Sequence, residues 1–301
     1  MKNRTLLIFA LLPIFILVAI VSVGPILYNI YISLTNMSLY HYADYEFIGL
    51  GNYQVLFTSP VSDFMRITIW NVSYCLLAVI LSFIIGVAAA EALPAIPGPV
   101  TRIARPLLIL PWVIPAFITI LIWKGFFDYQ FGPLNTLLGA LGLPKAPWLI
   151  DPAFAKVSII IVSVWLGVPF MMVTASGVIQ TLPKGIFEAA RLDGAGRLTT
   201  FRSFTVPLVF RRMFPVLIMG FSASFNNFTV IYLLTSGGPT YPESIGGAGA
   251  TDILLSYIFK LTLSSRRYGL AAAYAVFLFI AIGTFTLLNA WWMRRGREEV
   301  F

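Results

Sequence analysis

The sequence predicts an all-α, polytopic membrane protein with six transmembrane helices. Its 301 residues are 59% hydrophobic and 11% charged, with a mean hydropathy of +0.89, whereas soluble domains carry about 25% charged residues. A helix needs about 20 apolar residues to cross a bilayer, and six segments are long enough. They are residues 6–33, 67–90, 103–123, 157–179, 210–234 and 269–293. We expect a single domain over residues 1–301.

The two terminal segments have flanks typical of membrane helices. Lys2 and Arg4 precede the first one, as in a signal peptide. Its apolar stretch, however, exceeds the roughly 7 to 15 residues of a signal core, and it lacks a small-residue cleavage site. We therefore expect it to stay in the membrane. After the last segment, Trp291 and Trp292 precede Arg294 and Arg295, which indicates an interfacial aromatic belt.

The distribution of basic residues predicts the orientation. The amino terminus, residues 91–105, residues 180–212 and the carboxyl tail hold 13 of the 20 Lys and Arg and five acidic residues. These segments therefore carry the whole net charge of +8, while the remaining residues are neutral in sum. By the positive-inside rule they are cytoplasmic. We expect both termini in the cytoplasm of a bacterial or archaeal cell, and the chain in its cytoplasmic membrane.

Composition and motifs exclude several functions. The basic residues are not interleaved with aromatic ones, so the pI near 9.7 reflects topology and not nucleic-acid binding. The single cysteine, Cys75, lies in an apolar segment, and the single histidine, His41, is a loop residue. We find no cluster typical of a metal site or an enzymatic nucleophile. The glycine run at 246–249 lacks the lysine of a nucleotide-binding loop, so we expect no ATP site and no enzymatic activity in this chain.

The apolar segments have no Asp, Glu, Lys, Arg or His near their middles. Carriers driven by protons or sodium generally need such groups inside the membrane. A secondary carrier is therefore the less favoured alternative, and we expect the driving energy to come from another subunit.

The most charged stretch of the chain, residues 182–208, is predicted to form two short helices joined by a sharp turn. Glu188 and Arg191 share a face of the first helix because they are three residues apart. Asp193 and Gly194 end that helix, since glycine readily adopts the left-handed conformation. A second amphipathic piece, residues 197–204, follows before Pro207.

This stretch resembles the EAA loop of ABC importer permeases, which implies a type I permease fold. The matching residues are Glu188, Ala189, Ala190, Asp193, Gly194, Ala195, Phe201, Pro207 and Leu208, while Phe204 and Val206 depart from the usual pattern. In that family the loop is a cytoplasmic coupling helix that enters a cleft of a separate ATPase subunit. The resemblance implies ATPase contact for Glu188, Ala189, Ala190, Asp193, Gly194 and Ala195. The alternative is a basic amphipathic loop that rests on the membrane surface.

The fourth and fifth segments carry uncharged polar residues and helix breakers, which are costly in lipid and so face protein or water. At 100° per residue, Gly220, Ala223, Ser224 and Asn227 share one face of the fifth segment. Ser222, Asn226 and Thr229 share the opposite one. We expect one face to line a solute path and the other to bond a neighbouring helix. The alternative is that both faces serve only packing between helices.

The last two-thirds of the chain is similar to the larger membrane subunits of maltose/maltodextrin-type ABC transporters. The similarity rests on residues 165–170, 225–239, 251–254 and 268–273. It implies sugar contacts by the fourth and fifth segments at Leu166, Gly167, Phe170, Gly220, Ala223, Ser224 and Asn227. Gly220, Ala223, Ser224 and Phe170 differ from the residues usual at these positions. Counterparts of the extra amino-terminal spans and large periplasmic domain are not found, so binding-protein docking is expected on the outer loops.

The expected function is therefore that of a membrane-channel subunit of an ATP-driven ABC importer. By alternating access it would move a sugar such as maltose, maltodextrin, trehalose or a related oligosaccharide across the cytoplasmic membrane. The resemblance implies a second permease subunit, a dimeric ATPase that binds ATP and magnesium, and an extracytoplasmic sugar-binding protein. Membrane lipid surrounds the chain. A permease for another polar solute, such as glycerol phosphate, is the alternative within this family.

Overall fold

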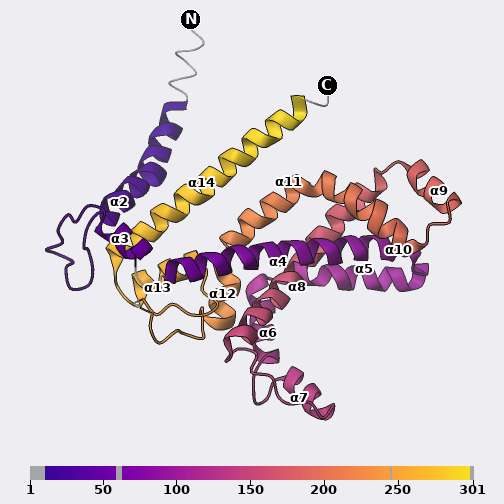
Figure 1. The fold of residues 1–301 in the computed structure, drawn as a ribbon, viewed down its shortest axis with the longest axis horizontal. Coiled ribbons are helices and arrows are strands. Elements are labelled where there is room, and N and C mark those ends of the chain that lie inside the picture. The colour runs from indigo at the N-terminus through magenta and orange to yellow at the C-terminus, as the bar shows by residue number, and fades with distance from the viewer. Residues whose placement is uncertain (1–10, 59–62, 245, 299–301) are drawn as a thin grey trace, which may run out of the picture. The chain divides into compact units, whose positions relative to one another are not determined.

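A computed structural model describes the backbone of residues 11–58, 63–244 and 246–298, and side-chain surroundings up to residue 287 except at residue 95. This backbone is nearly all helical (Figure 1). Within the described ranges β-structure is limited to the isolated bridges Thr35–Phe47 and Thr240–Gly249. The predicted all-α class is confirmed. Lys2 and Arg4 lie outside the described residues, as do the side chains of Trp291, Trp292, Arg294 and Arg295.

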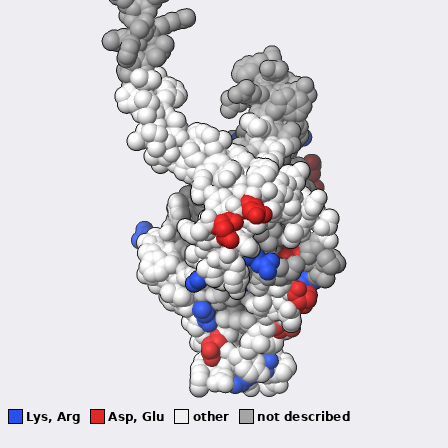
Figure 2. All heavy atoms as spheres, turned by 90° about the vertical axis from the view of Figure 1, so that its left-hand side faces the viewer, with Lys and Arg blue, Asp and Glu red and all other residues white. Residues whose placement is uncertain are grey.

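Within the described residues, five helices are long and apolar enough to cross a membrane. They are Leu11–Ser33, Asp63–Ala92, Pro152–Gln180, Arg197–Phe225 and Tyr268–Leu287. Their length and hydropathy agree with the membrane character that the composition predicted. Figure 2 shows a face on which basic and acidic side chains lie among residues of other kinds.

The third predicted segment, residues 103–123, is not one straight helix. It falls on α5 (Gly98–Val113) and α6 (Ala116–Phe126), which are bent by 100° and together count as a sixth possible span. The break lies at Ile114, which is extended with φ −77° and ψ 133°. Ile114 precedes Pro115, and the residue before a proline is sterically biased away from the helical region.

The fifth predicted segment, residues 210–234, is also wrong as a single helix. The structure has α11 (Val206–Phe225) and α12 (Phe228–Thr235), separated by Asn226 and Asn227. Asn227 has φ −80° and ψ 78°, outside the helical region. Asparagine side chains bond nearby backbone groups and so compete with helix formation, and the Asn226 amide donates to Ser222 O at 3.2 Å.

The predicted second helix of the 182–208 stretch does not end before Pro207. Instead α10 (Arg197–Thr200), the π-helical turn η3 (Phe201–Thr205) and α11 form one continuous helix, Arg197–Phe225. Pro207 lies in the first turn of α11. A π-helical turn shifts the hydrogen-bond register. Here the turn directly precedes the region of Pro207, which cannot donate a backbone hydrogen bond.

The chain divides into two compact units. The first comprises residues 1–66, 242–248 and 257–301. It contains η1 (Ala19–Val23), α2 (Gly24–Ser33), α3 (Gly51–Thr58), most of α13 (Leu254–Leu263) and α14 (Tyr268–Glu298). Helix α14 packs on α2 and α3. The buried Asn52 amide donates to Ser33 O at 2.9 Å and Thr35 O at 2.7 Å, which fixes α3 against the end of α2.

The second unit comprises residues 67–241 and 249–256. It contains most of α4 (Asp63–Ala92), η2 (Leu93–Ala95), α5, α6, α7 (Pro133–Ala140), α8 (Pro152–Gln180), α9 (Lys184–Leu192), α10, η3, α11 and α12. Helix α8 is central in this unit, because α5, α6, α11 and α12 all pack on it. Its start is fixed by Asp151, whose carboxylate accepts from Ala153 N and Phe154 N, as N-cap residues do.

Within the second unit, residues 237–239 are joined to residues 249–252 around a fully buried carboxylate. Asp252 accepts from Gly249 N and from Ser256 Oγ, both at 2.7 Å. Thr251 Oγ1 donates to Gly238 O at 2.6 Å, and Ala250 N donates to Pro239 O at 2.7 Å. A buried charge needs such hydrogen bonds. The backbone of residues 237–239 must therefore lie close to that of residues 249–252.

Gly237 supplies that approach, and its replacement gives a stability test. It has φ +77°, and an added Cβ would overlap the carboxylate of Asp252; Gly247 has φ +73° but open space around it. The left-handed conformation alone costs a non-glycine residue about 1–2 kcal/mol. We therefore expect Gly247→Ala to lower stability by about that amount, and Gly237→Ala by about 1–3 kcal/mol more, because buried hydrogen bonds are disturbed. Thermal unfolding of both purified variants in detergent measures the difference, and equal midpoints would contradict the assigned role of Asp252.

Candidate functional site

A cavity of about 420 Å³ lies in the second unit between α4, α8 and α11. All seven residues predicted to contact solute line it, although they are up to 61 positions apart in the chain. Leu166, Gly167 and Phe170 come from α8, and Gly220, Ala223 and Ser224 come from α11. Asn227 comes from the break after α11. The structure thus brings the predicted set together, and its role in solute contact stays a prediction.

Small residues allow α4 and α8 to approach closely beside this cavity. A Cβ on Gly167 would lie 2.6 Å from Ser82 Oγ, and one on Gly86 would lie 2.7 Å from Met171 Cβ. Both distances are below ordinary contact. At Gly220, in contrast, a Cβ would lie 3.5 Å from the nearest atom, at Met171. A Cβ at Gly167 would therefore displace the Ser82 side chain, whereas Gly220 contributes open space to the cavity.

The cavity also has polar residues that the sequence analysis missed. The hydroxyl groups of Tyr74 and Ser163 lie 3.0 Å apart, and Ser82 lines the same wall. The available signal was the presence of Tyr74 and Ser82 inside an apolar segment, but no motif directed attention to α4. None of the lining residues is Asp, Glu, Lys, Arg or His. The cavity therefore offers neutral hydrogen-bonding groups in an apolar surround.

Ser224 and Asn227 add two further polar groups, and neither side chain bonds another residue in the described part of the chain. Asn226, in contrast, is exposed and bonds its own helix. The expected bond from Asn226 to a neighbouring helix is therefore wrong within the described residues. Asn226 and Asn227 lie in different surroundings, as predicted. The cause is the break at these two residues between α11 and α12, and not two opposite faces of one continuous helix.

The 182–208 stretch presents a helix with one buried and one exposed side. Helix α9 begins at Lys184 and ends at Leu192. Glu188 and Ala189 are exposed, while Ala190 is 4% exposed. Leu192 is 90% exposed and shares the outer side with Glu188 and Ala189. The sequence analysis missed Leu192, although its spacing of four residues from Glu188 gave a signal.

The end of α9 has the hydrogen bonds of a Schellman-type cap. Gly194 has φ +77°, Gly194 N donates to Arg191 O at 3.1 Å, and Ala195 N donates to Ala190 O at 2.9 Å. Asp193 N donates to Ala189 O at 3.0 Å. The predicted end of the helix at Asp193 and Gly194 is confirmed. The turn holds the exposed side of α9 in one orientation.

One apolar cluster joins this stretch to the cavity. It contains Val79 and Met171, which line the cavity, and Leu182, which precedes α9. Phe187 of α9 and Phe201 of η3 pack against the same cluster. Cores of this kind are close-packed and transmit displacement. The exposed helix and the cavity therefore belong to one packed body.

A polar contact also closes the base of the stretch. The Arg212 guanidinium of α11 donates to Thr181 O at 3.2 Å and contacts Thr181 Oγ1. Thr181 is the C-cap of α8, where a cation interacts favourably with the last carbonyl groups. The contact links the end of α8 to the beginning of α11, so the two ends of the 182–208 stretch are held together.

Proteins similar to this chain are membrane subunits of transport systems. The galactooligosaccharides transport system permease protein GanP of Bacillus subtilis (strain 168) is 36% identical over 281 residues, which are 91% of this chain and 66% of GanP. The maltose/maltodextrin transport system permease protein MalF of Salmonella typhimurium (strain LT2) is 38% identical over 252 residues, 80% of this chain and 48% of MalF. The chain thus spans about half to two-thirds of these relatives.

Similarity in fold extends over nearly the whole chain. A chain in the crystal structure of a bacterial alginate ABC transporter, in complex with a periplasmic protein that binds alginate pentasaccharide, matches with a TM-score of 0.74. The match covers 95% of this chain and 93% of that one at 20% identity. The family described as "Binding-protein-dependent transport system inner membrane component" matches residues 82–295, which include α9 and all residues that line the cavity except Tyr74, Ala78 and Val79. The chain belongs to this family of inner membrane transport components.

Proposed function

We propose that this chain is one permease subunit of an ATP-driven ABC importer that moves a neutral oligosaccharide across the cytoplasmic membrane. The observation that carries the proposal is the packed connection between two features: a neutral, hydrogen-bonding cavity and an exposed helix with the EAA pattern. The names of the relatives agree with it, since GanP is named for galactooligosaccharides and MalF for maltose and maltodextrin.

The chemistry of the cavity favours an uncharged solute. Tyr74, Ser82, Ser163, Ser224 and Asn227 supply hydroxyl and amide groups that donate and accept hydrogen bonds. The apolar remainder suits the faces of sugar rings. A phosphate or carboxylate would instead require a cationic partner in this low-dielectric place, and the lining residues supply none. This argues against glycerol phosphate, and also against acidic saccharides such as alginate.

The exposed side of α9 is suited to docking on an ATPase. Glu188 offers a carboxylate to a basic group, Ala189 permits close contact, and Leu192 offers an apolar anchor. Asp193, Gly194 and Ala195 form the cap that orients this side, and Ala190 packs beneath it. We assign the chain's coupling role to these residues. ATP and magnesium are bound by the partner ATPase, and this chain catalyses no reaction itself.

We infer the other subunits of the proposed transporter from the family to which the chain belongs. A dimeric ATPase offers two clefts and this chain has one EAA loop, so a second permease subunit is required. An extracytoplasmic binding protein delivers the sugar to the outer loops. The concentration of positive charge in residues 91–105 and 180–212 supports a cytoplasmic location for these segments, and with them for both termini. A secondary carrier works without an ATPase subunit and would therefore not explain the EAA pattern.

The coupling role is tested by changing the charge of Glu188 in graded steps. Glu188→Gln removes the attraction to a basic partner and should reduce uptake in part, whereas Glu188→Lys adds repulsion and should abolish it. The measurement is oligosaccharide uptake by cells, with the amount of inserted chain and of bound ATPase determined in parallel. Thr199→Lys places the same side chain on the exposed side of α10, with half the change in charge, and serves as the control. Normal uptake with Glu188→Lys would remove the basis for the coupling assignment.

The cavity is tested by a comparison of the two neighbouring asparagines. Asn227→Ala should weaken the apparent affinity for the sugar by about threefold to tenfold, because one hydrogen bond is worth about 0.5–1.5 kcal/mol. Asn226→Ala removes an amide that is exposed outside the cavity and should leave affinity unchanged. Uptake is measured against sugar concentration in cells with equal amounts of assembled complex. A change of affinity in Asn226→Ala but not in Asn227→Ala would show that the solute path lies elsewhere.

A further inference from the structure

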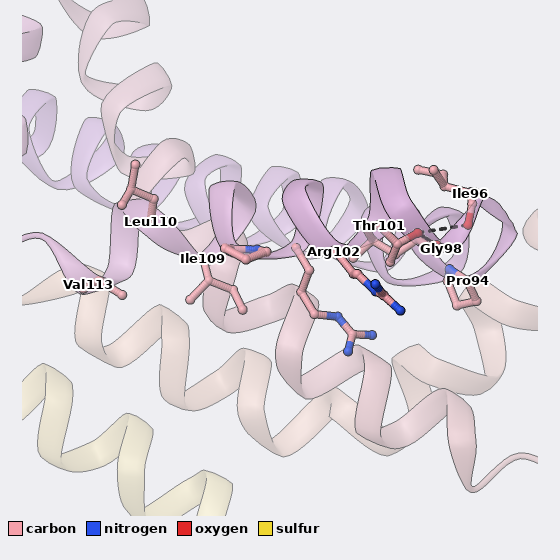
Figure 3. A pocket seen from close by; sticks show the side chains of 11 residues that line it. Pro94, Ile96, Gly98, Thr101, Arg102, Ile109, Leu110 and Val113 are labelled. Carbon is pink, nitrogen blue, oxygen red and sulfur yellow. Dashed lines mark hydrogen bonds between the residues drawn. The ribbon is translucent and has the colours of Figure 1, made fainter.

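A second, larger groove runs along α5, on the second unit but apart from the cavity. It has a volume of about 880 Å³ and extends from the turn that follows α4 to the end of α5 (Figure 3). The turn at its beginning contains Pro94 and Ile96. Thr101 Oγ1 donates to Ile96 O at 2.9 Å and so fixes this turn against the first turn of α5.

The chemistry of the groove changes along the helix. Arg102 and Arg105, three residues apart and thus on one side of the helix, lie near its beginning. Ile109, Leu110 and Val113 line the other end. The groove is therefore cationic at one end and apolar over the next two turns.

Neither guanidinium is neutralised by the protein. In the described part of the chain, no carboxylate lies within ion-pair distance of Arg102 or Arg105, and both side chains are exposed. Figure 3 labels Arg102 between Ile109 and Thr101 along α5. Guanidinium groups bind phosphate through two parallel hydrogen bonds. The pair is therefore free to bind an anion.

The position of the groove in the unit adds a second constraint. The turn after α4 and the coupling stretch lie at the same end, because Glu91 and Pro94 line one open pocket together with Phe187 and Arg191. This is the end at which the basic segments gather, so the arginines stand where the apolar part of α5 meets the membrane surface. A ligand here has its charged group at the interface and its apolar part in the membrane.

We propose that this groove binds an anionic glycerophospholipid, with the phosphate on Arg102 and Arg105 and an acyl chain along Ile109, Leu110 and Val113. Free phosphate would use only the cationic end and leave the apolar end unexplained. Arginines that merely extend to the interface would show no preference among lipids. Basic pockets on the cytoplasmic side of membrane helices are suited to anionic head groups. The site is independent of the identity of the transported solute.

The test uses the assembled transporter in nanodiscs of phosphatidylcholine with traces of spin-labelled phosphatidylglycerol or spin-labelled phosphatidylcholine. The fraction of immobilised label gives the relative affinity of the two lipids. Each arginine near the surface contributes about 1 kcal/mol to anionic lipid binding, and 1.4 kcal/mol is a tenfold change. We therefore expect preference for phosphatidylglycerol to fall about fivefold in Arg102→Gln and about thirtyfold in the double variant Arg102→Gln with Arg105→Gln.

The control removes two positive charges elsewhere, by Arg266→Gln with Arg267→Gln, and should keep the preference. An excess of inorganic phosphate should not displace the labelled lipid, because phosphate lacks the apolar part. Ile109→Asn should weaken binding of both labelled lipids to the groove. Equal affinity for the two lipids in the unaltered complex would overturn the proposal, as would a preference that the double variant and the control change alike. If another subunit covered the groove, the two lipids would also bind with equal affinity, and the proposal would be overturned.

Discussion

The apolar cluster between the cavity and α9 is the physical link on which the rest of the site depends. Met171 belongs to the cavity wall and to this cluster, and Phe187 carries α9 on its other side. A close-packed interior does not deform continuously but shifts between discrete arrangements. In the proposed function, a force applied to the exposed side of α9 is transmitted through this cluster to the cavity wall. The Arg212 contact with Thr181 keeps both ends of the loop within the same body.

Two local departures from regular helix give the cavity its shape. The missing side chain at Gly167 lets Ser82 and α4 approach α8. The break at Asn226 and Asn227 ends α11 and leaves the Asn227 amide at the cavity without a bond to another described residue. Polar groups without internal partners at membrane depth are costly. A polar solute that forms hydrogen bonds with these groups would offset this cost, which is consistent with an uncharged, hydroxyl-rich ligand.

The sequence was sufficient for the helical class, for most of the apolar segments and for the grouping of the predicted site residues, whose roles stay predictions. Hydropathy and charge report on the solvent of each helix, so the positions of α4, α8 and α14 followed from them, although each helix extends beyond its predicted segment. The breaks at Ile114 and at Asn226 did not, because a proline or an asparagine is tolerated in many continuous membrane helices. The contribution of Tyr74 and Ser163 could not be predicted either, since it depends on how α4 and α8 cross. Leu192 was not predicted, because the sequence alone does not show whether a leucine is buried or exposed.

The proposed importer moves its solute by alternating access, in which one cavity opens in turn to the two sides of the membrane. The accessibility of a single cysteine in the cavity tests this central claim. Ser224→Cys is introduced with Cys75→Ala, since Cys75 is the one native cysteine. The complex is placed in vesicles of known orientation and treated with a membrane-impermeant maleimide. The account predicts labelling only from the ATPase side without nucleotide, and only from the opposite side when the binding protein is present and the ATPase is trapped with ATP and vanadate. Labelling from both sides in one state, or from the same side in both states, would contradict it.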